Sequence, residues 1–281
     1  MIISGIRAEL STFVKLAGYL PIPPVQNALK LSDRLNTYGR VAIENHKEYI
    51  NSSAGSNSIS LFSRFLDSSR NGDISIPQIS AEASNLIIAG SDTTAVSLTY
   101  LVWAVNRPQN REIKRKLQAE IDSLPLDASL ADISDLKYLR MVVNESLRLY
   151  GAAPGSLPRV CPPGGAKLGD YFIPGGTTVS TQAYTLHRDE AIFENPGSFV
   201  PERWQSPTED MRHAFMPFGG GSRVCIGMHL AMNELMLGTF VFFKTCPSIT
   251  LAESTTDASM EIENYFLIAP KSHRCEVKIV K

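Results

Sequence analysis

A glycine-rich stretch that ends in a cysteine, residues 218–227, holds the residue types best suited to chemistry in this chain. It runs Phe-Gly-Gly-Gly-Ser-Arg-Val-Cys-Ile-Gly, and a helical pattern over residues 228–243 follows at once. A cysteine just before a helix start lies among free N–H groups, at the positive end of the helix dipole, where the thiolate is favoured over the thiol. Glycines let the backbone approach a flat ligand closely. Cys225 is therefore a candidate thiolate ligand for the iron of a haem.

A lone cysteine after a glycine-rich turn is more often a buried structural thiol, so its neighbours decide between the two interpretations. Phe218, Gly221, Arg223, Cys225 and Gly227 occupy five fixed positions in this short stretch. At these positions the chain resembles the cysteine loop of the cytochromes P450, the haem-thiolate monooxygenases. The resemblance implies haem b (iron protoporphyrin IX) as the cofactor and Cys225 as the axial ligand of its iron.

The resemblance also implies which other residues contact the haem. Phe218 would shield the sulfur from water, and Gly219 and Gly227 would belong to the part of the loop that lies against the haem. Arg223 and Arg159 would each pair with a propionate through charge-assisted hydrogen bonds.

The composition is that of an ordinary globular protein. Hydrophobic residues make up 43% of the chain and the formal net charge is -1 at pH 7, so no basic excess points to nucleic acid. The four cysteines show no CxxC spacing and are too sparse for a disulfide framework, which is consistent with a reducing compartment. Arg7, Glu9 and Lys15 interrupt the apolar N-terminal residues, so no secretory signal is expected there.

The elements that position these residues are predicted to be mainly helical. Apolar residues recur at helical spacing over residues 1–20, 25–50, 59–66, 75–108, 109–124 and 136–150. After residue 150 the pattern changes to short strands bounded by Pro and Gly, at 157–160, 166–168, 171–173 and 178–181. Segments 265–268 and 276–280 are predicted to form a closing hairpin. The predicted fold is therefore mainly α with a small β region.

The helix over residues 75–108 contains the sequence Ala-Gly-Ser-Asp-Thr-Thr at 89–94. A threonine in mid-helix is unfavourable, and its hydroxyl commonly bonds back to the carbonyl four residues earlier. By itself the motif would be structural. The resemblance implies instead that this helix crosses the distal face of the haem, where Gly90 leaves room for dioxygen, Thr93 hydrogen-bonds the oxygen and Asp92 relays protons.

Glu145 and Arg148 lie on one face of the helix over 136–150, because they are three residues apart. Such a pair is usually exposed and contributes little to stability. The resemblance implies that here the pair is buried and joined by Arg203, which lies in the segment 195–227 that holds the family's meander and cysteine loop. His187 and Arg188 are interpreted as structural.

The resemblance also implies which residues border the substrate. Ala89 and Gly90 would do so from the long helix, and Ala153 and Leu157 from the segment after the 136–150 helix. The sequence of residues 215–223 looks most like that of fungal P450s that serve secondary metabolism.

The implied function is that of a haem-dependent monooxygenase, which hydroxylates or epoxidises an apolar organic substrate with O2. The sequence has no dinucleotide-binding fingerprint, so a separate NADPH-cytochrome P450 reductase is expected to supply the electrons. One alternative is a truncated form that is catalytically inactive, either haem-binding or partly folded. A second is a haem-thiolate isomerase or dehydratase, against which Asp92 and Thr93 argue, and a third is a purely structural protein.

The resemblance runs along the whole chain, which is expected to form a single P450-like domain over residues 1–281 that corresponds to the C-terminal part of the family fold. Family members usually lie at the endoplasmic-reticulum membrane through an N-terminal anchor. That anchor is expected to have no counterpart here, which would make the protein cytoplasmic or peripheral. The early helices that cover the haem's other propionate edge in the family are also expected to have no counterpart, so weak haem retention is expected.

Overall fold

The computed structural model describes residues 23–52 and 60–280. The expected helical pattern over 1–20, with Arg7, Glu9 and Lys15, lies outside the described residues. The chain divides into two compact units, Met1–Asp92 and Thr93–Lys281, and the division falls inside the longest helix. The expectation of a single domain stays a prediction.

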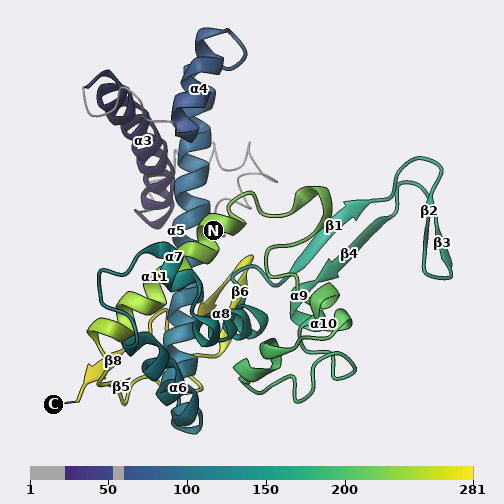
Figure 1. Cartoon of the computed structure of the whole chain (residues 1–281). Coiled ribbons are helices and arrows are strands. Elements are labelled where there is room, and N and C mark those ends of the chain that lie inside the picture. The colour runs from purple at the N-terminus through teal and green to yellow at the C-terminus, as the bar shows by residue number, and fades with distance from the viewer. Residues whose placement is uncertain (1–22, 53–59, 281) are drawn as a thin grey trace. The chain divides into compact units, whose positions relative to one another are not determined.

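The first unit consists of helices packed side by side. It contains α3 (Pro23–Asn51), α4 (Leu61–Arg70) and the first part of α5 (Ile76–Asn106) (Figure 1). Ile43, Leu66, Ile79 and Ala83 form its apolar core. Helices α3 and α5 cross closely at Gly39, because a Cβ placed there would lie 2.1 Å from the Ser84 hydroxyl. Glycine at this crossing therefore lets the two backbones meet.

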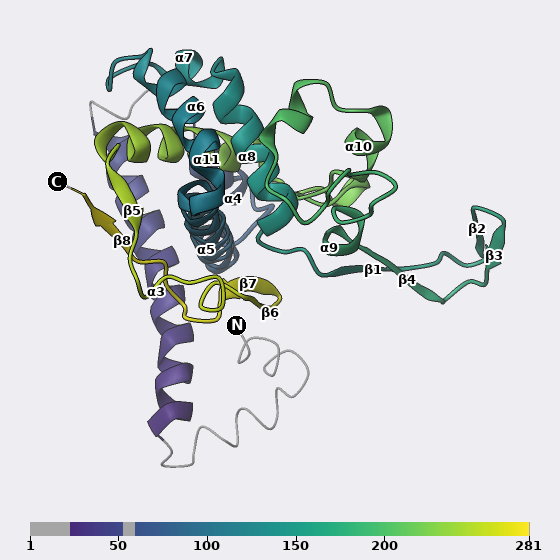
Figure 2. The ribbon, with the colours of Figure 1, turned by 90° about the horizontal axis from the view of Figure 1, so that it is seen from below.

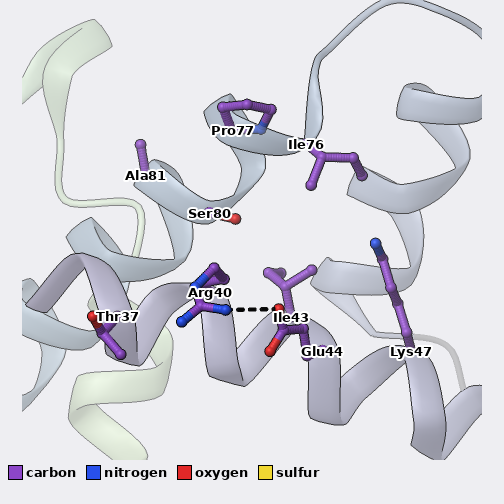
Figure 3. A pocket seen from close by; sticks show the side chains of 9 residues that line it. All are labelled: Thr37, Arg40, Ile43, Glu44, Lys47, Ile76, Pro77, Ser80 and Ala81. Carbon is purple, nitrogen blue, oxygen red and sulfur yellow. Dashed lines mark hydrogen bonds and ion pairs between the residues drawn. The ribbon is translucent and has the colours of Figure 1, made fainter.

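A groove of about 460 Å³ lies between α3 and α5 in this unit (Figure 3). Arg40 and Glu44, one turn apart on α3, form an ion pair of 3.2 Å in its wall. The remaining lining residues are Thr37, Ile43, Lys47, Ile76, Pro77, Ser80 and Ala81. None of the residues in this lining belongs to the site that the sequence predicts.

The second unit has a helical core. The rest of α5 packs with α6 (Arg111–Asp122), which a short 3-10 turn (Pro108–Asn110) precedes, and with α7 (Leu130–Ser134), α8 (Lys137–Tyr150) and α11 (Met228–Thr245) (Figure 2). Leu117, Leu139, Val142 and Phe240 are completely buried in this core. At Gly238 of α11 a Cβ would lie 3.2 Å from the Leu98 side chain, so α11 and α5 are in close contact there.

The start of α8 is held by a carboxylate from α6. Leu136, at the N-cap of α8, has no side chain able to accept a hydrogen bond from the first turn. Glu120 accepts instead from the N–H groups of Tyr138 (2.9 Å) and Leu139 (2.7 Å). The carboxylate satisfies free donors at the positive end of the helix dipole and so fixes α8 against α6.

The small β region consists of four antiparallel pairs. Strand β1 (Ser156–Val160) pairs with β4 (Thr178–Gln182), and β2 (Ala166–Leu168) pairs with β3 (Tyr171–Ile173). Strand β5 (Ile249–Leu251) pairs with β8 (Val277–Ile279), and β6 (Ile262–Tyr265) pairs with β7 (Leu267–Pro270). The mainly α fold with a small β region is therefore confirmed.

The predicted closing hairpin of 265–268 with 276–280 is wrong. The chain reverses at Phe266, whose φ is 89° and whose N–H donates to the Asn264 side chain, so β6 pairs with the strand that follows immediately. The Ala252 N–H donates to the Glu276 carbonyl at 2.9 Å and aligns the last strand with β5. A non-glycine residue at positive φ gives no turn signal in the sequence.

The second unit also contains short helices. Helix α9 (Ala183–Leu186) begins the segment that contains His187. Helices α7 and α10 (Glu209–Ala214) were not predicted, and each begins at a side-chain N-cap, Ser129 for α7 and Thr208 for α10. Within the described part of the chain, α5 is the one helix long and apolar enough to cross a membrane, a test that core helices of globular proteins also pass.

Candidate functional site

The cysteine loop lies between α10 and α11, and its glycines shape it. Gly219 (φ 73°) and Gly221 (φ 67°) adopt the left-handed conformation that side chains disfavour. The Gly219 N–H donates to the Met216 carbonyl at 3.0 Å, and the Cys225 N–H donates to the Phe218 carbonyl at 2.9 Å. Two turns in succession therefore fold the loop back on itself and deliver Cys225 to the start of α11.

The helix begins directly after the cysteine. The Met228 N–H donates to the Cys225 carbonyl at 3.3 Å, and Gly227 is the N-cap of α11. A Cβ placed on Gly227 would lie 3.8 Å from Cys225 Sγ, in ordinary contact with the sulfur. Glycine at this position therefore leaves that side of the thiol open.

The four cysteines all lie among the described residues, and Cys225 alone has an exposed side chain. Cys161 is buried, and its Sγ donates to the Ile173 carbonyl at 3.4 Å. Cys246 and Cys275 are half-buried, and burial raises the pKa of the Cys275 thiol to about 11. Accessibility therefore separates Cys225 from the other three thiols as a ligand.

The surroundings of Cys225 fit a flat apolar group such as haem. Val224 is 44% exposed, Ile226 is 90% exposed and Leu230 is 62% exposed, so the thiol stands in an open apolar rim. Large apolar side chains that are exposed together on a surface usually mark a site for a ligand or another chain. Across residues 23–52 and 60–280, no three or more His, Cys, Asp and Glu side chains gather into a metal site. A prosthetic group that brings its own ring of ligands and takes one thiolate from the protein suits this arrangement.

The predicted haem contacts are only partly brought together. Phe218 is half-buried and packs against the helical core of the second unit. A Cβ on Gly219 would lie 3.5 Å from Leu157, so strand β1 adjoins the cysteine loop. Arg159 on β1 and Arg223 in the loop are both exposed, and Arg159 donates to the neighbouring Pro158 carbonyl at 2.8 Å. Propionate binding by these two arginines stays a prediction.

Glu145 is the centre of a buried polar network behind the loop. Its carboxylate, fully buried, accepts from Arg148 Nε (2.9 Å) and Nη2 (2.8 Å) and from Arg203 Nε (3.1 Å). It also accepts from Trp204 Nε1 (2.9 Å) and from the Val200 N–H (2.8 Å). The structure therefore brings the three predicted residues together and adds two donors that sequence reasoning missed.

Arg148 extends this network to backbone carbonyls of residues 187–198. Its Nη1 donates to the carbonyls of His187 (2.6 Å) and Pro196 (2.8 Å), and its Nη2 donates to the Ser198 carbonyl (3.0 Å). The charged groups are thus nearly all hydrogen-bonded, which is what their burial requires. The Trp204 ring packs on Phe215 with centroids 4.5 Å apart, which connects the network to the start of the cysteine loop.

The Ala-Gly-Ser-Asp-Thr-Thr sequence at 89–94 lies on α5 where the two units divide, with Ala89, Gly90 and Asp92 in the first unit and Thr93 in the second. A Cβ on Gly90 would meet no atom within 4 Å, so space beside it is open. Thr94 Oγ1 donates to the Glu234 carboxylate of α11 at 3.1 Å, within the second unit. The Thr94 hydroxyl is therefore already engaged with α11.

The segment predicted to border substrate adjoins the β6–β7 hairpin. The Ile268 N–H donates to the Ala152 carbonyl at 2.9 Å, next to the half-buried Ala153. A Cβ on Gly155 would lie 3.4 Å from the Asn264 amide, and Phe266 at the hairpin tip is 69% exposed. The hairpin that contacts this segment therefore carries an exposed aromatic ring at its tip.

A mainly helical fold that presents one accessible cysteine on a glycine loop, backed by a buried Glu–Arg–Arg network, is the arrangement of a haem-thiolate protein. The cytochrome P450 family model matches residues 3–277. The chain belongs to the cytochrome P450 family.

Its relatives carry matching names. The chain is 44% identical over 278 residues to "Cytochrome P450 monooxygenase tazI" of Aspergillus terreus, a match that covers 98% of this chain and 56% of the relative. It is 40% identical to "Cytochrome P450 monooxygenase orf2" of Aspergillus niger, over 94% of this chain and 53% of the relative. It is 38% identical to "Cytochrome P450 monooxygenase azaI", also of Aspergillus niger, over 94% of this chain and 60% of the relative. The chain thus spans about half the length of the curated relatives it matches.

Proposed function

We propose that this protein is a haem-dependent monooxygenase that inserts one atom of dioxygen into an apolar organic substrate of fungal secondary metabolism. The observation that carries the proposal is the exposed Cys225 on a glycine loop, whose preceding residue Phe215 packs on Trp204 of the buried Glu145 network. The names of the Aspergillus relatives, each a P450 monooxygenase, support the reaction type. The site residues then have separate roles.

Cys225 would hold the haem through Sγ, with Arg223 and Arg159 at its propionates. When bound, haem b supplies the iron centre at which dioxygen is reduced. Phe218 would shield one side of the sulfur from water. The apolar rim at Val224, Ile226 and Leu230 fits the face of the porphyrin.

Thr93 and Asp92 would deliver protons from α5. A hydroxyl at Thr93 Oγ1 can hold a proton where charge develops, and the exposed Asp92 carboxylate can exchange it with solvent. Ala153, Leu157 and the Phe266 tip would present apolar surface to the substrate.

The electrons would come from a separate NADPH-cytochrome P450 reductase. The test combines the purified chain with haem, that reductase and a panel of apolar aromatic compounds, under ¹⁸O-labelled dioxygen. Label in a product that requires NADPH is the expected result, and Asp92→Asn should reduce it. Label-free product made without NADPH would instead support an isomerase or dehydratase. Bound haem with no NADPH-dependent product from any compound would support the inactive haem-binding form.

A further inference from the structure

His187, which follows α9, uses both nitrogens of its buried ring. The side chain is 1% exposed. Its Nε2 lies 2.9 Å from the Met216 N–H, which can only donate, so Nε2 accepts. The hydrogen is therefore on Nδ1, which lies 2.9 Å from the Arg148 carbonyl and donates to it. The two partners thus fix one neutral tautomer of this histidine.

The Nδ1 bond belongs to the end of α8. The carbonyls of a last helical turn lack partners inside the helix. The His187 ring donates to the Arg148 carbonyl, and Arg188 Nη2 donates to the Leu149 carbonyl at 2.6 Å. Arg148 in return donates to the His187 carbonyl at 2.6 Å. This side of the histidine is a helix cap made by another segment of the chain.

The Nε2 bond leads to a different place, the cysteine loop. Met216, whose N–H donates to Nε2, also supplies the carbonyl that accepts from the Gly219 N–H at 3.0 Å. Phe218, inside that turn, supplies the carbonyl that accepts from the Cys225 N–H at 2.9 Å. The His187 ring is therefore connected to the backbone of Cys225 through the backbone of Met216 and two further hydrogen bonds.

Ring packing strengthens the same junction. The Phe215 ring, next to Met216, lies 5.4 Å from the His187 ring and 4.5 Å from the Trp204 ring, measured between centroids. Trp204 in turn donates to Glu145. Segments containing α8, α9 and α10 lie close together in both overall views (Figures 1 and 2). Phe215, just before the cysteine loop, therefore contacts both His187 and Trp204.

We propose that His187 is a positioning residue for the thiol: through Nε2 it holds the Met216 peptide and thereby sets where Cys225 stands. The consequence for a thiolate ligand rests on the proposed function, whereas the effect on the loop does not. The role belongs to Nε2 and is separate from the helix cap made by Nδ1. The two can be separated by substitution.

Replacing His187 with asparagine or with glutamine should keep one of its two hydrogen bonds and lose the other. In place of histidine, the amide nitrogen of asparagine falls near Nδ1 and can still donate to the Arg148 carbonyl. The amide oxygen of glutamine falls near Nε2 and can still accept from the Met216 N–H. His187→Asn should therefore release the loop and His187→Gln should keep it. A residue that acts only as a helix cap would give the opposite order.

The first measurement is hydrogen exchange of the full chain, which needs no haem. In His187→Asn the amides of residues 216–225 should exchange roughly tenfold faster, the change expected when one buried hydrogen bond is lost. In His187→Gln they should exchange as in the parent. The exposed histidine of α10 provides the matched controls, His213→Asn and His213→Gln, which should both behave as the parent. Equal exchange in the two His187 variants, or faster exchange in the glutamine variant, would overturn the proposal.

The second measurement is the spectrum of the reduced, carbon-monoxide-bound protein with haem added. The share of thiolate-type band should fall in His187→Asn and be restored in His187→Gln. A parent chain with no such band would contradict the proposed function, while the exchange test of His187 would still apply. If neither variant folds, ¹⁵N shifts of the His187 ring in the parent decide: hydrogen on Nδ1 supports the proposal, and hydrogen on Nε2 refutes it.

Discussion

Removal of the Glu145 carboxylate is expected to be among the most destabilising single changes in the second unit. Glu145→Ala deletes the acceptor of five hydrogen bonds, from Arg148 (two), Arg203, Trp204 and Val200. The side chains of Glu145 and Arg148 are both 0% exposed, and that of Arg203 is 8% exposed. Two guanidinium groups would then stay buried without their counter-ion.

The magnitude follows from this burial. Removing one partner of a buried ion pair typically costs about 3–5 kcal/mol, because the remaining charge is left uncompensated. For an exposed pair the cost is roughly 0–1 kcal/mol. Glu112 provides the matched control: it pairs with Arg115 at the same i, i+3 spacing and 2.7 Å, yet it is 61% exposed. Glu145→Ala should lower the melting temperature by roughly 6–20 °C, at about 2–4 °C per kcal/mol for a unit of this size.

The assay is thermal unfolding of the full chain followed by circular dichroism, with Glu112→Ala measured beside Glu145→Ala. Glu145→Gln keeps the side-chain shape but loses the charge and replaces an accepting oxygen with a donating amide, so it should fall between the parent and Glu145→Ala. Glu112→Ala should melt within about 4 °C of the parent. A melting temperature for Glu145→Ala equal to that of Glu112→Ala would refute the reasoning, since the pair would then behave as an exposed one.

Three further outcomes are expected. In the haem-loaded protein with reductase, Thr93→Ala should keep haem and divert NADPH electrons into peroxide, whereas Thr94→Ala should not; unchanged coupling in Thr93→Ala would remove Thr93 from the mechanism. Burial lowers the pKa of His187 from 6.5 to about 4, so the unfolded chain binds a proton that the folded chain does not. The free energy of unfolding should therefore fall as pH falls from about 6.5 to 4, by about 3 kcal/mol from this group, and urea titrations should show a shallower fall in His187→Gln. Glu120→Ala should cost about 0.5–2 kcal/mol, because it uncaps α8, and an unchanged urea midpoint would contradict that role.

The β region shows what local signals can predict. Strands β2 and β3 were predicted with their observed bounds because glycines with positive φ surround them, at Gly164, Gly165, Gly169 and Gly176. These positions require glycine, so the sequence itself shows where each strand must end. The reversal at Phe266 carries no such residue, which is why the C-terminal strands were paired wrongly.

The site shows what such signals cannot predict. Cys225 and the Glu145–Arg148 pair belong to short sequence motifs with fixed spacing, so they could be found without a structure. The bond from the Met216 N–H to His187 joins a backbone group to a side chain 29 positions away. Nothing in the local sequence records a backbone donor or its distant acceptor. The side chain that holds the cysteine loop was therefore visible only once the fold was known.

The most direct test of the central claim is the spectrum of the reduced, carbon-monoxide-bound chain in which Cys225 is replaced. Cys225→Ser should abolish the thiolate-type band, because the exposed sulfur at the start of α11 is the proposed iron ligand. Cys246→Ser, a change at a half-buried cysteine beyond the other end of the same helix, should keep the band. A thiolate-type band that survives in Cys225→Ser and disappears in Cys246→Ser would contradict the account.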